Sequence, residues 1–562
     1  MTGNRRRFIR GSNRSYVLLT IAIWAVLYLP NLWWRDLTGT DEPKYAQVAR
    51  EVLLDGHWFA LHHNGDPYYG EPPLYFWLEA LLSLPYGDVT PFIAMLTACL
   101  FGLGTMLLTY SLGKRLFDAD TGFLGAAILA TLPQFHNFSC TARLNVPFTF
   151  FITAALTAFY FGYSEVNVGA TRLRLTVAPT SYFSWGWVLL GLAAITEKGP
   201  IAFILVGATV LVFLWRRGEL RLFLETRPVL GLFLSAVPVT LWLLPAYLTV
   251  GRSYMEGLFG QFNSQVTTPL GVDKFLFYFS AIFVDGSPWS ILLPFAFYAY
   301  WKERGAGVPQ RDFLWTWLFV ILITFSIILQ KFSRYILPLY PAVALILAHF
   351  CGGYIRRPAL REWTSIKGAL CWGLAPFLGL LFAWIFFGLH THKLVLSYLI
   401  IGAMGVGLLG LSFVVRQIFR DKQWEVLFVF TFLVTSSFQM SYNRFLFPWE
   451  KENRSERAYC EELKGLMEPG APWAVYRIFR PAQVYYTKSH PKAISSEEEL
   501  VSFWAGGPPE ADATVSLPGK VYCLMAEADY NGLTSTGRVP LFKVAELQGL
   551  HKARLVLVSN LP

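Results

Sequence analysis

The sequence predicts a polytopic α-helical membrane protein that carries a small soluble α/β domain near its C-terminus. Of its 562 residues, 54% are hydrophobic and 15% are charged, and the mean hydropathy is +0.42. A water-soluble enzyme of this length would be far more polar. Two further patterns support this fold class: apolar runs long enough to cross a bilayer, and an alternating distribution of lysine and arginine between them.

The apolar runs approach the roughly 20 residues that a helix needs to cross about 30 Å of hydrocarbon. Thirteen such runs can be drawn, at 15–34, 90–112, 121–138, 146–163, 183–196, 199–215, 228–250, 288–301, 313–329, 335–355, 366–389, 394–415 and 425–441. We therefore expect thirteen spans in a membrane domain at 1–441, followed by a soluble domain at 442–562. The first run lacks a cleavage site and is expected to remain as an anchor.

Lysine and arginine concentrate in alternate loops, which sets the expected orientation. With the N-terminus in the cytoplasm, the cytoplasmic segments hold 23 of these 47 residues, the opposite short loops hold 10, and the tail after Ser441 holds 14. Because cytoplasmic loops carry the excess, we expect loop 35–88 and the tail to lie outside the cytoplasm. Cations at membrane edges also explain the net charge of +10 without nucleic-acid binding.

The first outer loop, residues 35–88, is the charged segment between the first two strongly apolar spans. Apolar residues recur at helical spacing over 45–53, which predicts an amphipathic juxtamembrane helix lying on the membrane surface. A double proline at 72–73 breaks the chain before a second apolar helix. Asp41 lies just past the first span, where protein can shelter a carboxylate that substrate still reaches. It is either a reactive group or the N-cap of a helix begun by segment 40–43.

The later outer loops are short and place ionisable residues beside hydrocarbon, where such residues usually face a cavity or a partner. They occur in three groups: Arg143 with Asn145, Glu197 with Lys198, and Lys331 with Arg334 and Tyr335. Because all three groups lie on the same predicted side as Asp41, we expect one shared cavity.

The tail after Ser441 has the mixed pattern of a small α/β domain. It predicts helices at 454–467 and 497–504 and strands at 473–478, 483–487, 520–525 and 554–558. Cys460 and Cys523 both fall in this exported segment, where a disulfide is permitted but is not established by two cysteines.

A carboxylate among cations on the outer face favours a membrane enzyme that transfers a group from a lipid phosphate. The cations would hold the phosphate leaving group and stabilise the charge that develops on it. The carboxylate would take the proton from an acceptor hydroxyl. If the donor is a glycosyl phosphate attacked in line, one base is enough and the configuration of the sugar inverts.

Six sequence motifs occur in order between roughly residues 30 and 345: DEPKYAQVAREVLLDGHW, NGDPYYGEPPLYFW, ARLNVPFTFF, TEKGP, DGSPWSILLP and KFSRYILPLYP. In this order they resemble the GT-C glycosyltransferases of the aminoarabinose transferase and protein O-mannosyltransferase type. Each motif alone is weak, but their joint occurrence is specific.

The resemblance implies thirteen spans, a periplasmic active site at the bacterial inner membrane and a periplasmic α/β tail. It implies transfer of a sugar, with inversion, from a polyprenyl (undecaprenyl) phosphate donor to lipid A, another glycolipid or a glycan, by a monomer among membrane lipids. Asp41 would be the catalytic carboxylate, with Lys44 at the family's usual arginine position. The other residues expected to bind the lipid phosphate are Tyr68, Arg143, Lys198, Lys331, Arg334 and Tyr335, and Glu42, Glu71 and Asn145 are expected to line the site.

The chain departs from the family pattern around the expected pocket. Glu71 stands where the family has a lysine before the double proline, Gly70 where an acidic residue is usual, and Asn145 where an aspartate is common. Either Lys44, Arg143 and Lys198 replace the lost lysine, or the donor differs, or catalysis has been lost.

Two other functions compete with transfer. A transporter or flippase for a lipid-linked sugar would need paired repeats or broken spans with ionisable residues near mid-membrane, whereas the ionisable residues here cluster at the outer ends. A catalytically altered relative that acts as an envelope assembly partner is the second alternative. The proposed chemistry requires no cofactor, although His62, His63 and Glu71 could hold a divalent metal.

Overall fold

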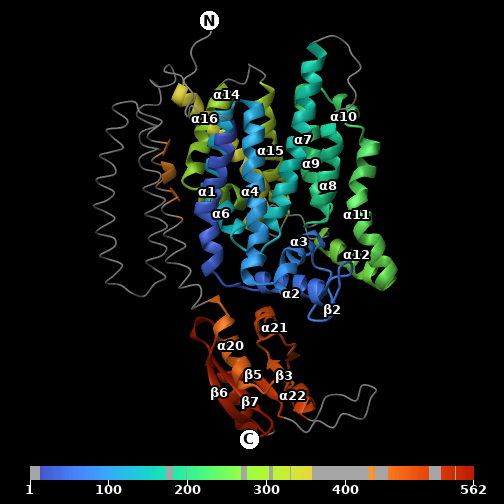
Figure 1. Ribbon diagram of the computed structural model, residues 1–562, viewed down its shortest axis with the longest axis vertical. Helices are drawn as coiled ribbons and strands as arrows, with labels where there is room; N and C mark the ends of the chain where they lie inside the picture. Colours follow the sequence, from blue (N-terminus) through green and yellow to red (C-terminus); the bar gives the residue numbers. More distant parts are fainter. Residues whose placement is uncertain are drawn as a thin grey trace, which may run out of the picture.

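The protein consists of a bundle of long helices and a smaller sheet domain formed by the end of the chain (Figure 1). A computed structural model describes residues 13–171, 181–197, 199–266, 275–302, 308–328, 331–356, several positions between 428 and 439, 454–504, 520–537 and 539–562. Helices α2 (Asp41–Leu54) and α3 (Leu74–Ser83) lie at the end of the bundle that faces the sheet domain. Helix α1 (Asn13–Trp34) begins at the opposite end.

The helices of the bundle follow the apolar runs of the sequence. After α1 they are α4 (Pro91–Leu116), α5 (Ala119–Thr131), α6 (Pro133–Ser139), α7 (Asn145–Thr171), α8 (Ser181–Ala194), α9 (Ile201–Arg217), α10 (Leu222–Glu225), α11 (Pro228–Val250), α12 (Arg252–Val266), α13 (Phe277–Asp285), α14 (Leu293–Lys302), α15 (Pro309–Ile327) and α16 (Tyr340–Arg356). Two 3-10 segments, η2 (Trp289–Leu292) and η4 (Ser333–Leu339), precede α14 and α16.

Within the described residues, six helices are long and apolar enough to cross a membrane. A seventh crossing results if Phe277–Asp285 and Trp289–Lys302, which meet at a bend of 116°, form one broken span. The predicted runs 366–389 and 394–415, and most of 425–441, lie outside the described residues. The chain is thus a multi-pass membrane protein, while the count of thirteen spans stays a prediction.

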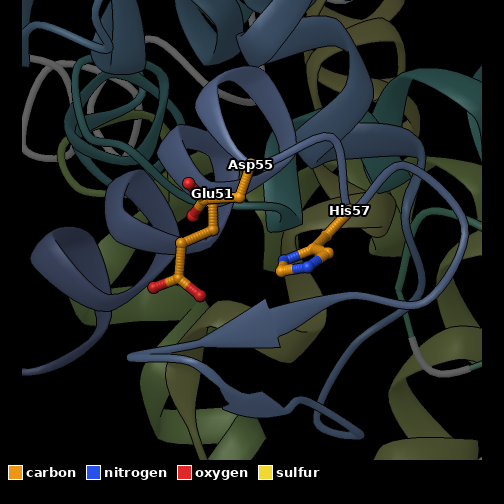
Figure 2. Close-up of side chains that lie close together, drawn as sticks. All are labelled: Glu51, Asp55 and His57. Atoms are coloured by element: carbon orange, nitrogen blue, oxygen red, sulfur yellow. The ribbon is translucent and has the colours of Figure 1, made fainter.

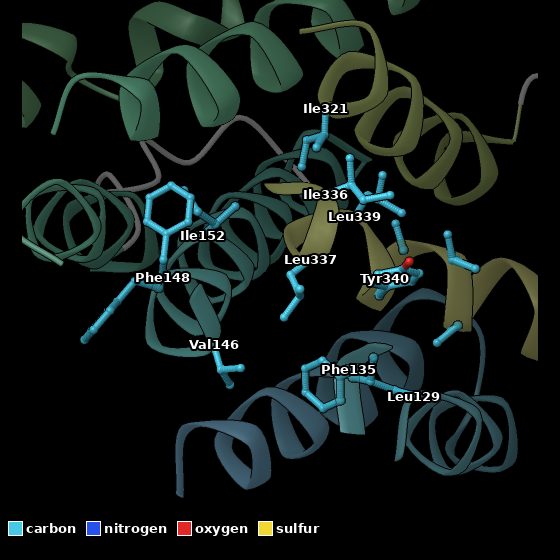
Figure 3. Close-up of a cluster of buried hydrophobic side chains, with 14 of the residues drawn as sticks. Leu129, Phe135, Val146, Phe148, Ile152, Ile321, Ile336, Leu337, Leu339 and Tyr340 are labelled. Atoms are coloured by element: carbon cyan, nitrogen blue, oxygen red, sulfur yellow. The ribbon is translucent and has the colours of Figure 1, made fainter. Parts of the chain in front are cut away.

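The core of the bundle lies where α5, α6, α7, α15 and α16 meet around η4. Figure 3 shows side chains from these elements: Leu129, Phe135, Val146, Phe148, Ile152, Ile321, Ile336, Leu337, Leu339 and Tyr340. The helices approach closely where glycine replaces a side chain: a Cβ atom on Gly122 of α5 would lie 2.4 Å from the Tyr110 carbonyl oxygen of α4. This packing fixes the start of α7, just after Arg143, and the segment η4, which contains Arg334.

The first outer loop folds into α2, a two-stranded hairpin, α3 and the 3-10 turn η1 (Leu84–Tyr86). In the hairpin, β1 (His62–His63) pairs antiparallel with β2 (Asp66–Pro67). The predicted helix at 45–53 is present, but it does not lie open on the membrane surface. Ten of its 14 residues are buried, including polar Gln47 and charged Arg50 and Glu51, because the hairpin and the sheet domain cover its polar side.

The sheet domain has five strands in the order β4-β3-β5-β7-β6. Its elements are α20 (Arg457–Leu466), β3 (Trp473–Tyr476), α21 (Pro481–Thr487), β4 (Lys492–Ile494), α22 (Glu497–Trp504), β5 (Tyr522–Ala526), α23 (Glu527–Thr536), β6 (Phe542–Gln548), η6 (Leu550–Lys552) and β7 (Arg554–Ser559). Strand β3 is parallel to both β4 and β5, whereas β7 is antiparallel to both β5 and β6.

One expectation for this domain was wrong. Segment 483–487 is helical and not a strand, because Pro481 takes an early helical position and the Gln483 side chain caps the backbone amide of Arg480. Cys460 and Cys523 are free buried thiols that belong to separate hydrophobic clusters. These clusters cover the two faces of the sheet, because successive strand residues alternate between them, so the two thiols do not form a disulfide.

The sheet domain is held against the first loop through α2 and α21. The Arg50 guanidinium donates to the Tyr485 carbonyl oxygen at 2.8 Å and pairs with Asp88 at 2.7 Å. Lys488 pairs with the other oxygen of Asp88 at 2.6 Å. The Tyr485 hydroxyl donates to the Val89 carbonyl oxygen at 2.7 Å. These contacts fix one face of the domain close to the helix that begins at Asp41.

Candidate active site

Asp41 is the first residue of α2, and its carboxylate is surrounded by three cations. The Oδ2 atom lies 2.8 Å from Arg143 Nη1 and 3.6 Å from Arg334 Nη1, and Oδ1 lies 3.9 Å from Lys44 Nζ. Thr40 occupies the N-cap position. The interpretation of Asp41 as the N-cap is therefore wrong, because its carboxylate faces cations from other segments.

Three separate segments bring these cations together. Arg143 ends the turn between α6 and α7, Arg334 lies in η4, and Lys44 follows Asp41 by one turn of α2. Residues three apart on a helix are neighbours, which gives Lys44 its position, and the packing of α7 against η4 gives the two arginines theirs. The carboxylate and the three cations are each 19–25% exposed in their side chains, so they line a surface that solute can reach.

Lys44 lies between two carboxylates. Its Nζ atom is 3.9 Å from Asp41 Oδ1 and 3.9 Å from Glu71 Oε1, and the Tyr45 hydroxyl donates to Glu71 Oε1 at 3.0 Å. Burial raises the pKa of Tyr45 well above its usual value, and the charges of Glu71 and Asp41 raise it further. Tyr45 therefore stays protonated and acts as a donor to Glu71, which in turn holds Lys44 near Asp41.

The hairpin positions Tyr68 on the other side of Lys44. Lys44 Nζ lies 5.6 Å from the centre of the Tyr68 ring, a distance typical of cation–π contact. The ring also explains Gly70, because a Cβ atom at that position would lie 2.5 Å from the Tyr68 hydroxyl oxygen. An acidic side chain at position 70 would displace this ring from its place beside Lys44.

Next to Asp41, Glu42 forms a more buried ion pair. Its carboxylate accepts two hydrogen bonds from Arg35, at 2.9 Å to Nη2 and 3.1 Å to Nη1, and the two side chains are 2% and 8% exposed. Arg35 also donates to the Cys140 carbonyl oxygen and to Thr38 Oγ1, at 3.2 Å each. This pair joins the end of α1, the start of α2 and the turn after α6.

A cavity of about 400 Å³ opens between the bundle and the sheet domain beside this cluster. Five arginines line it: Arg35, Arg143 and Arg334 from the bundle, and Arg454 and Arg480 from the C-terminal part of the chain. Its other charged and polar lining residues are Thr38, Glu42, Asn137, Thr141 and His551. The excess of guanidinium groups suits an anionic ligand that reaches from the sheet domain to Asp41.

Comparisons with known proteins agree with this architecture. The family profile described as dolichyl-phosphate-mannose-protein mannosyltransferase matches residues 13–257. An undecaprenyl phosphate-alpha-4-amino-4-deoxy-L-arabinose arabinosyl transferase from Pseudomonas paraeruginosa is 30% identical over 348 residues, which is 60% of this chain and 59% of that protein. An uncharacterized protein from Aquifex aeolicus is 29% identical over 338 residues, 60% of this chain and 64% of that protein. The chain thus spans less than two thirds of the length of either relative.

The crystal structure of ArnT from Cupriavidus metallidurans in the apo state superposes with a TM-score of 0.75 over 98% of both chains, at 18% identity. The same protein bound to undecaprenyl phosphate gives 0.74, over 98% of this chain and 99% of that one, also at 18% identity. The chain therefore has the fold of ArnT. Its fold extends over the bundle and the sheet domain alike.

The other predicted site residues that the structure describes make their contacts with groups other than the Asp41 carboxylate. Asn145 is buried and donates to Glu197 Oε1 at 2.7 Å, which ties the start of α7 to the turn after α8. Lys331 donates to the Phe325 and Ser326 carbonyl oxygens, at 3.0 and 2.6 Å, and so caps the end of α15. Tyr335 stacks on Phe325. Lys198 lies outside the described residues.

Part of the site was not predicted from the sequence, and the residues named as a possible metal site lie apart in the structure. Arg454, Arg480 and His551 reach the cavity from the tail, and no motif or spacing in the tail indicates this. His62, His63 and Glu71 do not converge: His62 Nδ1 lies 2.9 Å from the Ala60 carbonyl oxygen, and Glu71 accepts from Tyr45. Among the described residues, the ligand atoms that converge belong to Glu51, Asp55 and His57.

Proposed function

We propose that this protein is an inverting glycosyltransferase that moves a sugar from a polyprenyl phosphate to a lipid A-like glycolipid or a glycan. The single observation that carries the proposal is the partly exposed Asp41 carboxylate within 4 Å of three cations at the edge of a basic cavity. The naming of relatives as undecaprenyl phosphate-sugar transferases, and a fold shared with a protein crystallised with undecaprenyl phosphate, support the choice of donor.

In the proposed reaction, Asp41 is the general base and Arg143, Arg334 and Lys44 bind the donor phosphate. Without donor the three cations neutralise Asp41. A donor phosphate competes for the same guanidinium and ammonium groups, which are good phosphate ligands, and so releases one carboxylate oxygen to the acceptor hydroxyl. Asp41 takes the hydroxyl proton, the acceptor oxygen bonds to the anomeric carbon, and the bond from that carbon to the phosphate oxygen breaks.

The leaving group then carries an additional negative charge, which the cations stabilise where it develops. Because attack and departure occur on opposite faces of the anomeric carbon, the configuration inverts. Glu71 supports this chemistry indirectly, since it holds Lys44 near Asp41 in the place where the family's lysine would stand. We therefore favour a retuned site over a lost one.

The arginine-lined cavity supports an anionic acceptor. Arg454 and Arg480 reach it from the C-terminal part of the chain, and Arg480 is oriented by Glu456 at 3.2 Å. An acceptor with phosphate or carboxylate groups, such as lipid A, would contact these arginines while its hydroxyl approached Asp41. A protein or neutral glycan acceptor would offer no anionic group to pair with these arginines.

We also propose the finer topology: thirteen spans, a cytoplasmic N-terminus, a periplasmic domain at 442–562 and a monomer in the bacterial inner membrane. The start of α1 and the sheet domain lie at opposite ends of the bundle (Figure 1), which supports an odd number of crossings. The excess of lysine and arginine in alternate loops supports the direction. A transporter is less favoured, because the described cations around Asp41 cluster at one end of the bundle.

The test is direct transfer by the purified chain. Protein in lipid nanodiscs is incubated with an undecaprenyl-phosphate sugar and lipid A, and products are measured by mass spectrometry. We expect a mass increase of one sugar and release of undecaprenyl phosphate, and neither with the Asp41→Asn variant. Envelope lipids and glycans of cells with and without the chain identify the natural sugar. Transfer that persists at the wild-type rate in Asp41→Asn would contradict the proposal.

A further inference from the structure

A second group of ionisable side chains lies at the far end of α2 and has no part in the proposed transfer. One ligand atom from each of Glu51, Asp55 and His57 lies within 4.8 Å of the others. Glu51 and Asp55 are four residues apart and therefore share one face of the helix. Gly56, at a φ of +76°, reverses the chain directly after the helix, and Figure 2 shows the His57 ring turned back toward the Glu51 carboxylate.

The Glu51 carboxylate is held in place by the hairpin turn. Its Oε1 atom accepts from the Asn64 amide at 2.6 Å and from Gln47 Nε2 at 2.9 Å, and Oε2 accepts from the Gly65 amide at 3.2 Å. Asn64 and Gly65 both have positive φ, at 59° and 84°, which aims two successive amides at one anion. Outer hydrogen bonds of this kind orient carboxylates that bind metals.

The His57 ring is also held in one orientation. It packs against the His62 ring in a tilted arrangement, with 3.9 Å between the ring centres and 32° between the planes. His62 is itself fixed by its Nδ1 contact to the Ala60 carbonyl oxygen at 2.9 Å. His57 Nδ1 is buried and has no hydrogen-bond partner among the described residues. A buried nitrogen without a partner is costly, and a cation bound by the ring would remove that cost.

Solute can reach this group of ligands. Asp55 is exposed, and a cavity of about 270 Å³ borders both Glu51 and Asp55. The wall of this cavity opposite α2 includes Lys488 and His490 of the sheet domain, so the group lies at the junction between that domain and the first loop. By the rise of an α-helix, Glu51 is about 15 Å from Asp41, which separates the two sites.

We propose that Glu51, Asp55 and His57 bind one divalent transition-metal ion, with Zn²⁺ as the best fit and water in the remaining positions. One imidazole nitrogen and two carboxylate oxygens form a ligand set that Zn²⁺ accepts. Ca²⁺ and Mg²⁺ prefer oxygen ligands only, whereas this group includes the imidazole of His57. The ion joins the end of α2 to the turn that leads into the hairpin, and so stabilises the segment that continues to Tyr68 and Glu71.

The test is metal binding by the full-length chain in detergent, independent of any transfer assay. The protein is stripped with a chelator, titrated with Zn²⁺ against a chromophoric competitor, and measured by mass spectrometry of the bound metal. We expect about one Zn²⁺ per chain and a higher melting temperature with Zn²⁺. Asp55→Asn and His57→Gln should each weaken binding at least tenfold and abolish the thermal shift. Because Asp55 is exposed, Asp55→Asn should still elute as folded protein.

The matched control is His349→Gln, which removes a histidine of α16 that stacks on Phe117 and should bind Zn²⁺ as the wild type does. Less than about 0.2 equivalents of Zn²⁺ on the wild-type chain at 10 µM free metal would overturn the proposal. Unchanged Zn²⁺ affinity in both Asp55→Asn and His57→Gln would also overturn it. Preferential binding of Ca²⁺ or Mg²⁺ would contradict the assigned metal class.

Discussion

Asp41 and Glu42 are consecutive carboxylates at the start of α2, yet their surroundings differ. Glu42 is 2% exposed and makes a two-bond pair with one arginine, Arg35, which is itself 8% exposed. Asp41 is 23% exposed, and three cations share it at distances from 2.8 to 3.9 Å. The Glu42–Arg35 pair is closed to solvent, and both oxygens of Glu42 accept hydrogen bonds from Arg35. The group around Asp41 is open enough for a ligand to enter.

The difference separates a structural ion pair from a reactive one. A buried charge pair is expensive to desolvate and is destabilising when one partner is removed, so the Glu42–Arg35 pair fixes geometry. The Asp41 carboxylate is partly exposed and is paired with three cations, so a second anion can also bind to these cations. The two residues should therefore respond oppositely to substitution, one in activity and the other in stability.

The largest expected effect is on activity, from Asp41→Asn. The amide keeps the size of the carboxylate but cannot accept the acceptor's proton, so transfer should fall by about 10²–10⁴-fold while the protein stays folded in the membrane. The matched control is Asp88→Asn, since Asp88 is 24% exposed and also pairs with an arginine and a lysine. Transfer by Asp88→Asn should stay within about threefold of wild type. Equal losses of transfer activity in Asp41→Asn and Asp88→Asn would show that Asp41 has no special role in the reaction.

Glu42→Gln should show the opposite pattern, with a loss of stability. It leaves Arg35 buried with a neutral partner, which costs about 3 kcal/mol or more, and should lower the melting temperature and the yield of membrane-inserted protein. Glu256→Gln is the control, because its pair with Arg252 is exposed on both sides, and exposed pairs contribute little. A Glu42→Gln protein with wild-type melting behaviour would mean that the pair is not a structural one.

Arg143→Ala tests whether the cations around Asp41 serve the donor. Loss of one charge-assisted contact to a phosphate is expected to raise the KM for the donor by about 10–100-fold, with a smaller change in kcat. Arg115→Ala is the control, since Arg115 lies near the end of α4, where it donates to Ser164. If Arg143→Ala lowers kcat alone and leaves the donor KM unchanged, the residue does not bind the ground-state phosphate.

A third carboxylate, Glu79 of α3, extends the comparison to a buried group that forms no ion pair with any of the described residues. It is fully buried, neither oxygen has a hydrogen-bond partner among the described residues, and burial raises its pKa to about 8. Between its usual value near 4.5 and about 8 the folded state holds a proton that the unfolded chain has lost. Stability must therefore fall as pH rises through this range.

The corresponding measurement is the melting temperature of wild type and Glu79→Gln between pH 5 and pH 8. Glutamine mimics the neutral acid, so the variant should lack this part of the decline and melt at least about 2–4 °C above wild type at pH 8. At pH 5 the two proteins should melt alike. A decline of the same size in both proteins would show that Glu79 does not titrate in this range.

The parts of the fold and site that the sequence predicted are those encoded by local patterns. Hydropathy located the long helices, and the spacing of residues 45–53 predicted α2. The strand expected at 483–487 failed because QVYYT has high β-propensity, whereas tertiary contacts of Tyr485 with the first loop favour the helix. Strand β6 has only one buried residue, and the rest are exposed or half-exposed, so its alternation gave too weak a signal to predict it.

The candidate site divides in the same way. Asp41, Arg143 and Arg334 could be chosen from sequence because charged residues beside apolar spans are few and lie on one predicted face. The structural role of Glu42 could not be predicted from the sequence, because only its burial with Arg35 shows that the two residues form a closed ion pair. Arg454 and Arg480 could not be predicted as site residues either, because the cavity that they line depends on how the tail packs against the bundle.

The smallest expected effect comes from Glu71→Gln, and it tests how the site compensates for the family's missing lysine. Lys44 lies 3.9 Å from both Asp41 and Glu71, and removal of the second carboxylate should let its flexible side chain move. We expect kcat/KM to fall about three- to tenfold, since Lys44 remains present but less well placed. Glu71→Lys should be worse than Glu71→Gln, because a second ammonium would repel Lys44 in this protein. Activity equal to or above wild type in Glu71→Lys would instead mean that Lys44 and the family's lysine bind phosphate independently, and that Glu71 does not position Lys44.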